Sequence, residues 1–187
     1  MTTAQRQHTF EHRINSAIAW GLRHWLLVAN SIVLLYGGLP WLSPLLRAAG
    51  FDALGKGIFL AYRPLCHQLP ERSFFVFGYQ VAFCHREAAM YTLLFAGGLL
   101  FALVRDRLKP LRFAVGGLLL LPMLLDGGSH LVDDVLHLGL RGGGDAPGTL
   151  NFWLRMITGL LFAVAMILVV YPRLEREFAS DLVTQAR

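Results

Sequence analysis

The chain has 187 residues, of which 55% are hydrophobic and 16% are charged, and its mean hydropathy is +0.51. Soluble domains carry roughly a quarter charged residues, so this composition excludes an ordinary soluble protein and indicates a polytopic membrane protein. The net charge of +5 comes from basic residues at the ends of apolar segments rather than from one patch. This distribution fits membrane topology and speaks against a nucleic-acid partner.

The apolar segments predict the fold class. Residues 1–23 are polar and basic, with apolar residues at helical spacing, which predicts an amphipathic helix on the membrane surface. Residues 51–62 are too short to cross a bilayer and predict a second interfacial helix. The segments long enough to cross are residues 25–46, 85–104, 111–131 and 151–171. We therefore expect an all-α membrane protein in which four transmembrane helices and short interfacial helices form one bundle.

The basic residues predict the orientation. Four of the eight residues in 105–112 are basic, which is typical of a cytoplasmic loop. With four spans, both termini are then cytoplasmic, and the loops around residues 66–84 and 126–151 face outward. The expected division is a cytoplasmic amphipathic leader, a four-span domain in the cell (inner) membrane and a cytoplasmic tail, over residues 1–23, 24–175 and 176–187.

Two charged residues lie within the expected spans. The apolar run that begins at Leu111 stops at Leu125, and a crossing of about 30 Å needs about 20 residues, so Asp126 lies on the order of 7 Å below the outer surface. Arg155 lies on the order of 6 Å inside the same boundary. Because a charge in lipid is costly, we expect both side chains to face the bundle interior and to pair. An ion pair that only fixes helix register is the alternative.

A possible metal-binding face follows Asp126. The polar residues at helical spacing after it are His130, Asp133 or Asp134, and His137. One helical face could present these carboxylates and imidazoles to zinc or iron. However, Gly127-Gly128 is expected to interrupt the helix where the pattern begins, and a solvated acidic helix would show the same spacing.

The segment 63–87 holds both cysteines, two of the seven histidines and three arginines. Its cysteines could form a structural disulfide, or one residue from each of the pairs Cys66-His67 and Cys84-His85 could bind a metal. A divalent metal such as zinc is the cofactor that such residues suit. The metal ligands predicted on this basis are His67, Cys84, Asp126 and His130.

Arginines at the outer boundary indicate an anion pocket, because guanidinium groups bind phosphate oxygens in a bidentate way. Ordinary anchoring to lipid head groups would give the same pattern. The ligand-binding residues predicted here are Gln68, Arg72, Arg86 and Arg155. We expect His67 and Asp126 to act as catalytic acid–base groups. Glu87 most simply stabilises a helix N-terminus, and the alternative is a proton acceptor near His67.

Several motifs also carry a family resemblance. They are Cys66-His67-Gln68, the run Pro70-Glu71-Arg72-Ser73-Phe74-Phe75, Gly78, Cys84-x-Arg86, Tyr91, Leu121-Pro122 before Asp126-Gly127, and Asn151 with Arg155 and Thr158-Gly159. Over roughly residues 63–159 the chain resembles the bacterial and archaeal membrane proteins catalogued as domain of unknown function 2085. The resemblance implies a small helical membrane protein with an outward polar site. Two positions differ, since Glu87 stands where a second cysteine is expected and His130 where glutamine is expected.

These patterns together predict an outward-facing polar site that binds a metal ion or an anionic lipid-like ligand. As an enzyme, the protein would suit metal-assisted hydrolysis or transfer on a lipid. The alternative is a non-enzymatic subunit or carrier of a membrane complex, in which the polar cluster is structural. Short loops leave little room for a private substrate cavity, which favours this alternative or a homo-oligomer. The expected partners are the lipid bilayer and either a second copy or a larger membrane complex, with no nucleic acid.

Overall fold

The computed structural model describes residues 3–139 and 144–185. The α-helices in this part of the chain are α1 (Thr3–Arg23), α2 (Trp25–Ala48), α3 (Asp52–Ala61), α4 (His85–Val104), α5 (Phe113–Leu136), α6 (Leu150–Ala165) and α7 (Tyr171–Gln185). Between α3 and α4 lie the 3₁₀ turn η1 (Pro70–Arg72) and the strands β1 (Ser73–Val76) and β2 (Tyr79–Cys84). The π-helical segment η2 (Met166–Val170) joins α6 to α7.

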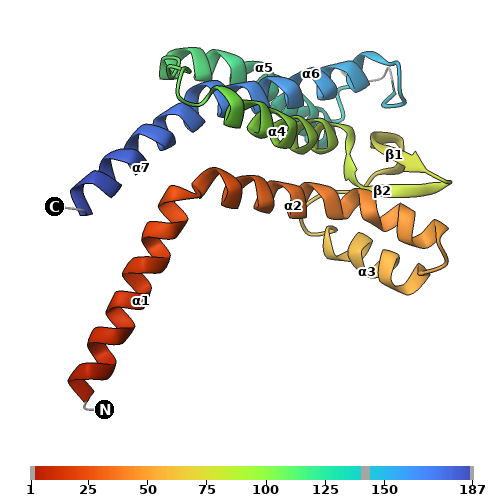
Figure 1. Cartoon of the computed structure of the whole chain (residues 1–187). Helices are drawn as coiled ribbons and strands as arrows, with labels where there is room; N and C mark the ends of the chain where they lie inside the picture. The colour runs from red at the N-terminus through yellow and green to blue at the C-terminus, as the bar shows by residue number, and fades with distance from the viewer. Residues whose placement is uncertain (1–2, 140–143, 186–187) are drawn as a thin grey trace.

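The predicted fold class is confirmed. The segments long and apolar enough to cross a membrane are Trp25–Ala48, His85–Val104, Phe113–Asp133 and Leu150–Leu182. Helix α6 packs against both α4 and α5, and α2 packs against α4 and carries α3 beside it (Figure 1). Helices α1 and α7 extend away from this bundle at the end where both chain termini lie (Figure 1). We call the opposite end, which carries β1 and β2, the hairpin end.

The hairpin was not expected from the sequence. Its turn is Phe77-Gly78, and both residues have positive φ, 51° and 80°. A two-residue turn with this backbone is of type I′, the form that joins antiparallel strands most readily. The aromatic Phe77 is 75% exposed, whereas Phe83 on β2 is fully buried against the end of the bundle. The hairpin therefore covers the end of the bundle and fixes where α4 begins.

The expected interfacial helix is α3, which packs closely on α2. The Ser43 hydroxyl donates to the Gly55 carbonyl oxygen at 2.9 Å, and a Cβ at Gly55 would lie 2.7 Å from the Ser43 carbonyl oxygen. Hydrogen bonds from Lys56 and Arg47 hold the pKa of the Asp52 carboxyl below its ordinary value. The pair between Arg47 and Asp52 ties α3 to the end of α2, whereas Lys56 pairs with Asp52 within α3 itself.

The expected helix interruption at Gly127-Gly128 is wrong, because α5 continues through both glycines to Leu136. Helical glycine costs about 1 kcal/mol relative to alanine, which tertiary packing can outweigh. Here Gly127 leaves room for the Arg86 guanidinium, since a Cβ at this position would lie 3.2 Å from Arg86 Nη1. The helix ends before His137, which adopts the left-handed conformation with φ of 52°.

The last apolar helix continues past Tyr171 through the π-helical segment η2. Pro172 has no N–H, so it cannot donate to the Leu168 carbonyl oxygen. That oxygen instead accepts a hydrogen bond from the Leu111 N–H at 3.0 Å. The Arg173 guanidinium donates to the carbonyl oxygens of Val169 and Leu111. The irregular turn thus satisfies its backbone groups through the segment that precedes α5.

Gly159 allows the close approach of α6 to α4. A Cβ there would lie 2.6 Å from the Arg86 carbonyl oxygen and 3.1 Å from the Met90 backbone nitrogen. We expect Gly159→Ala to destabilise the protein by about 1–3 kcal/mol, measured as a lower melting temperature in detergent. Gly117→Ala is the matched control, because a Cβ at Gly117 meets nothing within 4 Å. Equal melting temperatures for the two variants would contradict this packing.

Candidate functional site

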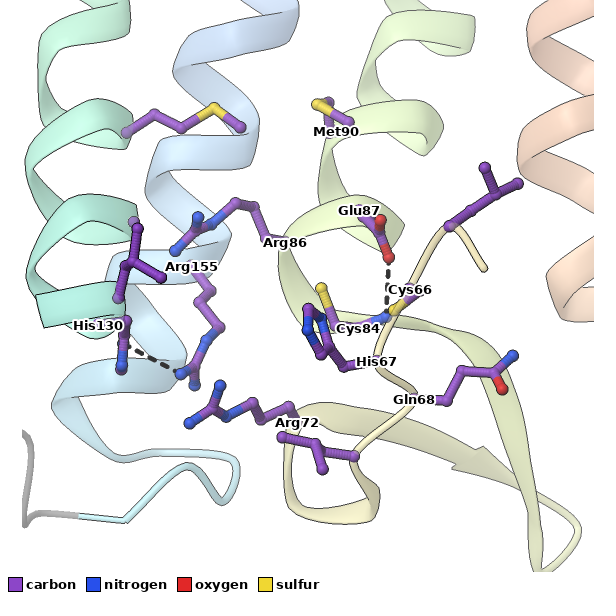
Figure 2. A pocket seen from close by; sticks show the side chains of 15 residues that line it. Cys66, His67, Gln68, Arg72, Cys84, Arg86, Glu87, Met90, His130 and Arg155 are labelled. Atoms are coloured by element: carbon purple, nitrogen blue, oxygen red, sulfur yellow. Dashed lines mark hydrogen bonds between the residues drawn. The ribbon is translucent and has the colours of Figure 1, made fainter. Parts of the chain in front are cut away.

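A cavity of about 410 Å³ opens at the hairpin end, between α4, α5, α6 and the chain that leads into η1 (Figure 2). Its wall combines basic side chains with apolar ones. The basic part consists of His67, Arg72, Arg86, His130 and Arg155. The apolar part includes Leu65, Leu69, Met90, Met123 and Leu131. The residues predicted as catalytic, ligand-binding or metal-binding all line this cavity except Asp126, which is bound to one of its arginines. Asp133 and His137, which the helical spacing added to a possible metal-binding face, lie outside its lining.

The first ion pair of the site joins α4 to α5. The Arg86 guanidinium donates through Nη2 to Asp126 Oδ2, and the two side chains are 18% and 4% exposed. The sequence pattern predicts Arg155 as the partner of Asp126 and only a ligand role for Arg86. The partner is instead Arg86, whose guanidinium reaches α5 beside Gly127.

The second set of ion pairs involves Asp145, a residue that the sequence analysis did not select. Arg155 on α6 donates through Nη1 to Asp145 Oδ1. Arg72 in η1 donates through Nε to Asp145 Oδ2 at 2.6 Å. One carboxylate thus holds two arginines that are 83 residues apart in the chain. The loop before α6 therefore takes part in the cavity wall.

The charge state of Asp145 follows from these contacts. Burial acts to raise the pKa of the Asp145 carboxyl, but hydrogen bonds from Arg155 and Arg72 outweigh it and hold the pKa below its ordinary value. Asp145 is therefore ionised at neutral pH and offsets part of the charge of both arginines.

The Nε2 atom of His130 faces Arg155 on α6 and carries no proton. Arg155 Nη2 lies 3.1 Å from His130 Nε2, and Figure 2 shows this contact as a dashed line. Because a guanidinium can only donate, His130 Nε2 is the acceptor and its proton belongs on Nδ1. In this arrangement His130 supports Arg155 rather than presenting Nε2 to a metal.

Cys66, Cys84 and Glu87 form a cluster on the cavity wall. Their Sγ atoms and one carboxylate oxygen all lie within 4.8 Å of one another. Both cysteines are free thiols rather than a disulfide. A hydrogen bond between the two sulfurs raises the pKa of the Cys66 thiol and lowers that of the Cys84 thiol. Cys84 is therefore the sulfur that ionises more readily.

The start of α4 fixes two members of this cluster. Cys84 is the N-cap residue, and its sulfur accepts from the backbone N–H of Glu87. The Glu87 carboxylate accepts in turn from the Cys84 N–H at 3.4 Å. This is a capping box with cysteine in place of serine. The predicted role of Glu87 at a helix N-terminus thus describes one of its contacts, and its proximity to both sulfurs is a second feature.

The predicted metal set and the observed cluster share only Cys84. Among the residues that the structure describes, Cys66, Cys84 and Glu87 are the group close enough to hold one ion. His67 lines the cavity from an exposed position. Asp126 and His130 are bound to arginines, as described above, so the ligand set His67, Cys84, Asp126 and His130 stays a prediction that these contacts do not favour.

Gln68 serves the loop rather than the cavity. Its side-chain amide donates to the carbonyl oxygens of Phe59 and Ala82 at 2.7 and 3.3 Å. The backbone carbonyl oxygen of Gln68 accepts a hydrogen bond from Gln80 Nε2 at 2.8 Å. In Figure 2 its side chain points away from Arg72 and His67. With both amide hydrogens directed at backbone carbonyls, Gln68 holds the chain that carries Cys66 and His67, which disfavours the ligand role predicted for it.

Comparisons with known proteins agree with this fold. A family model described as "Predicted membrane protein (DUF2085)" matches residues 66–169, a range that includes the cysteine cluster and all three cavity arginines. The chain is also 26% identical over 156 residues to "Uncharacterized protein MJ1492" of Methanocaldococcus jannaschii, covering 80% of this chain and 92% of that relative. No solved structure matches the chain. The chain therefore belongs to the membrane-protein family of domain of unknown function 2085.

Proposed function

We propose that the protein binds the phosphate-bearing head group of an anionic membrane lipid in the cavity at the hairpin end. The observation that carries this proposal is the convergence of Arg72, Arg86 and Arg155 from η1, α4 and α6 on one cavity. Guanidinium groups bind phosphate oxygens through paired N–H donors. Buried arginines are energetically costly in a membrane-spanning protein, so a group of them in one cavity indicates a functional role.

Some guanidinium donors remain available to a ligand. Arg72 donates to Asp145 through Nε, so its two Nη groups could donate to a ligand. Arg86 Nε is buried, and within residues 3–139 and 144–185 it has no hydrogen-bond partner. An orphaned buried donor on a charged group is unfavourable unless a bound molecule or water completes it. A phosphate oxygen would satisfy this donor.

The apolar part of the wall supports a lipid rather than a water-soluble anion. Leu65 and Leu131 line the cavity and are still 56% and 65% exposed. The cavity mouth therefore continues into an apolar surface, which in a spanning protein faces lipid. An amphiphile could place its head group among the arginines and its first methylenes against these leucines.

The orientation and any reaction are part of the proposal. We place the hairpin end outward, because the basic loop at residues 105–112 is typical of the cytoplasmic side. We place the protein in the cell membrane with both termini cytoplasmic. Within an enzyme of lipid hydrolysis or transfer, His67 would be the acid–base group, because it is the exposed titratable residue at the cavity. Asp126 would act through Arg86, to which it is bound.

The alternative of a structural subunit or carrier rests on a specific observation. All three arginines already have carboxylate partners, Asp126 or Asp145. The three arginines are matched in number by the carboxylates of Asp126, Asp145 and Glu87. A purely structural cluster would require the same balance of charge. The two functions differ in whether an anionic lipid binds.

Binding of defined lipids to the purified protein tests the proposal. We expect native mass spectrometry in neutral detergent to show bound phosphatidylglycerol in preference to phosphatidylcholine. Arg72→Gln should weaken this binding roughly tenfold or more, since a hydrogen bond to a charged group contributes about 1.5–3 kcal/mol. Arg63→Gln is the matched control, because Arg63 is an exposed arginine of the same segment outside the cavity lining.

A competition arm separates a lipid head group from free phosphate. Inorganic phosphate at millimolar concentration should compete weakly with the lipid if the apolar wall contributes, and fully if only the anion is bound. Absence of any anionic preference, or equal binding by the Arg72 and Arg63 variants, would reject the proposal in favour of a structural subunit.

A further inference from the structure

We infer that Cys66, Cys84 and Glu87 form a binding site for a divalent transition metal, with zinc as the ion that their donor atoms fit best. Two thiolates and one carboxylate oxygen are common zinc ligands, whereas magnesium and calcium take oxygen ligands alone. This site is distinct from the arginine wall that carries the proposed lipid binding. It also differs from any ligand set that the spacing of histidines in the sequence predicts.

The distances suit one shared ion. Zinc lies about 2.3 Å from a thiolate and about 2.0–2.2 Å from a carboxylate oxygen, so two tetrahedral ligand atoms are on the order of 3.7 Å apart. The three donor atoms lie within 4.8 Å of one another. Ligand atoms at the spacing that zinc requires would need side-chain movements of about 1 Å. Such movements need no change of the backbone, because the backbone already places the three side chains next to one another.

Two different segments supply the donors, and both are held in place. Cys84 and Glu87 belong to the first turn of α4, where the capping box fixes them. Cys66 precedes η1 and is 6% exposed, with its segment held by the Gln68 hydrogen bonds to Phe59 and Ala82. Capping alone would need only Cys84 and Glu87, and a disulfide alone would need only the cysteines. A metal ion accounts for all three together.

The fourth coordination position would face the cavity. Cys66, Cys84 and Glu87 all line the cavity, so the side of the ion opposite them meets its interior. Three protein ligands with one exchangeable position are typical of catalytic rather than structural zinc sites. Water, a ligand oxygen or the neighbouring imidazole of His67 could occupy that position.

The electrostatic surroundings favour the ionised donors. Two thiolates, one carboxylate and a divalent ion sum to one negative charge. The N-terminus of α4 favours negative charge at Cys84 and Glu87. Arg72, Arg86 and Arg155 line the same cavity, and their positive charges offset the remaining negative charge of the metal site.

Metal content of the purified full-length protein tests the inference. We expect about one zinc ion per chain by inductively coupled plasma mass spectrometry, falling to background in Cys84→Ser and in Glu87→Gln. Glu87→Gln is the sharper variant, because glutamine retains the capping hydrogen bond and removes the anionic ligand. Glu71→Gln is its matched control, since Glu71 is an exposed carboxylate of η1 outside the cavity lining. Melting temperatures of all variants are measured alongside.

A measurement on the wild type alone covers the case in which the cysteine variants fail to fold. After removal of bound metal by chelation, Co²⁺ should produce thiolate-to-cobalt charge-transfer absorption, and zinc should protect both thiols from alkylation. Absence of the cobalt band, a disulfide between the cysteines in the purified protein, or full metal content in a folded Glu87→Gln variant would each overturn the inference. Lipid binding is measured separately, so failure of either proposal leaves the other standing.

Discussion

Asp126→Asn is expected to destabilise the protein by about 3–5 kcal/mol, because the variant leaves the largely buried Arg86 guanidinium without its carboxylate. The charge on Arg86 then stands inside the bundle, between α4 and α5, at the level where Gly127 makes room for it. Removal of one partner from a buried ion pair costs more than the pair itself contributes, since the remaining charge stays desolvated. The measurement is the free energy of unfolding of the detergent-solubilised protein.

A double variant separates this explanation from a simple loss of packing. Arg86→Met combined with Asp126→Leu should recover most of the lost stability, because both charges are then absent and the volume is retained. Asp106→Asn is the control for a carboxylate change without burial, since the Asp106 side chain is 90% exposed. If Asp126→Asn unfolds with the same free energy as Asp106→Asn, the buried pair does not contribute to the fold.

The second large effect concerns Asp145 at acid pH. Its pKa is lowered in the folded protein, so the stability that it contributes is complete above the ordinary carboxyl pKa of about 3.8 and is lost as the pH falls through the lower folded value. Asp145→Asn removes the contribution at neutral pH and leaves Arg155, which is 3% exposed, without a carboxylate. We expect a loss of about 3 kcal/mol at pH 7.

The pH profile gives the control for this prediction. The stability difference between the wild type and Asp145→Asn should be constant from pH 5 to pH 7 and should shrink as the pH is lowered below about 4. Asp52→Asn should change the free energy of unfolding far less at neutral pH, because the Asp52 carboxylate is about half exposed and its pairs with Arg47 and Lys56 are screened by solvent. A difference between wild type and Asp145→Asn that is unchanged down to pH 2 would contradict the assignment.

Composition and hydropathy were sufficient for the fold class, since long apolar segments have few alternatives to membrane-spanning helices. The candidate site was recognisable for a related reason. A charged residue in an apolar segment is conspicuous, so Asp126 and Arg155 could be selected, and their depths could be compared by counting residues. Arg155 lines one cavity with His67, Arg72 and Arg86, and the role of these residues in a functional site stays a prediction.

The exact partners could not be derived in the same way. Pairing depends on the rotation of each helix about its axis, and residue counting gives only depth. Arg86 rather than Arg155 faces Asp126 because α4 packs between α2 and α6 in a register set by the hairpin and by Gly159. Asp145 lies in a polar loop where a carboxylate is unremarkable. Cys66 and Glu87 gave no joint signal because they are 21 positions apart in the chain, with a hairpin between them.

The π-helical segment η2 has a consequence for how the last helix presents its side chains. One extra residue in a helical turn shifts the phase of everything after it by about 100°. Downstream of η2, α7 consequently turns Tyr171, Glu175 and Phe178 toward Trp25. The Trp25 indole N–H donates to Glu175 Oε2 at 2.8 Å, and its ring contacts those of Tyr171 and Phe178. Because of the irregular turn, the continuous helix formed by α6, η2 and α7 packs one face against the bundle and a different face against the start of α2.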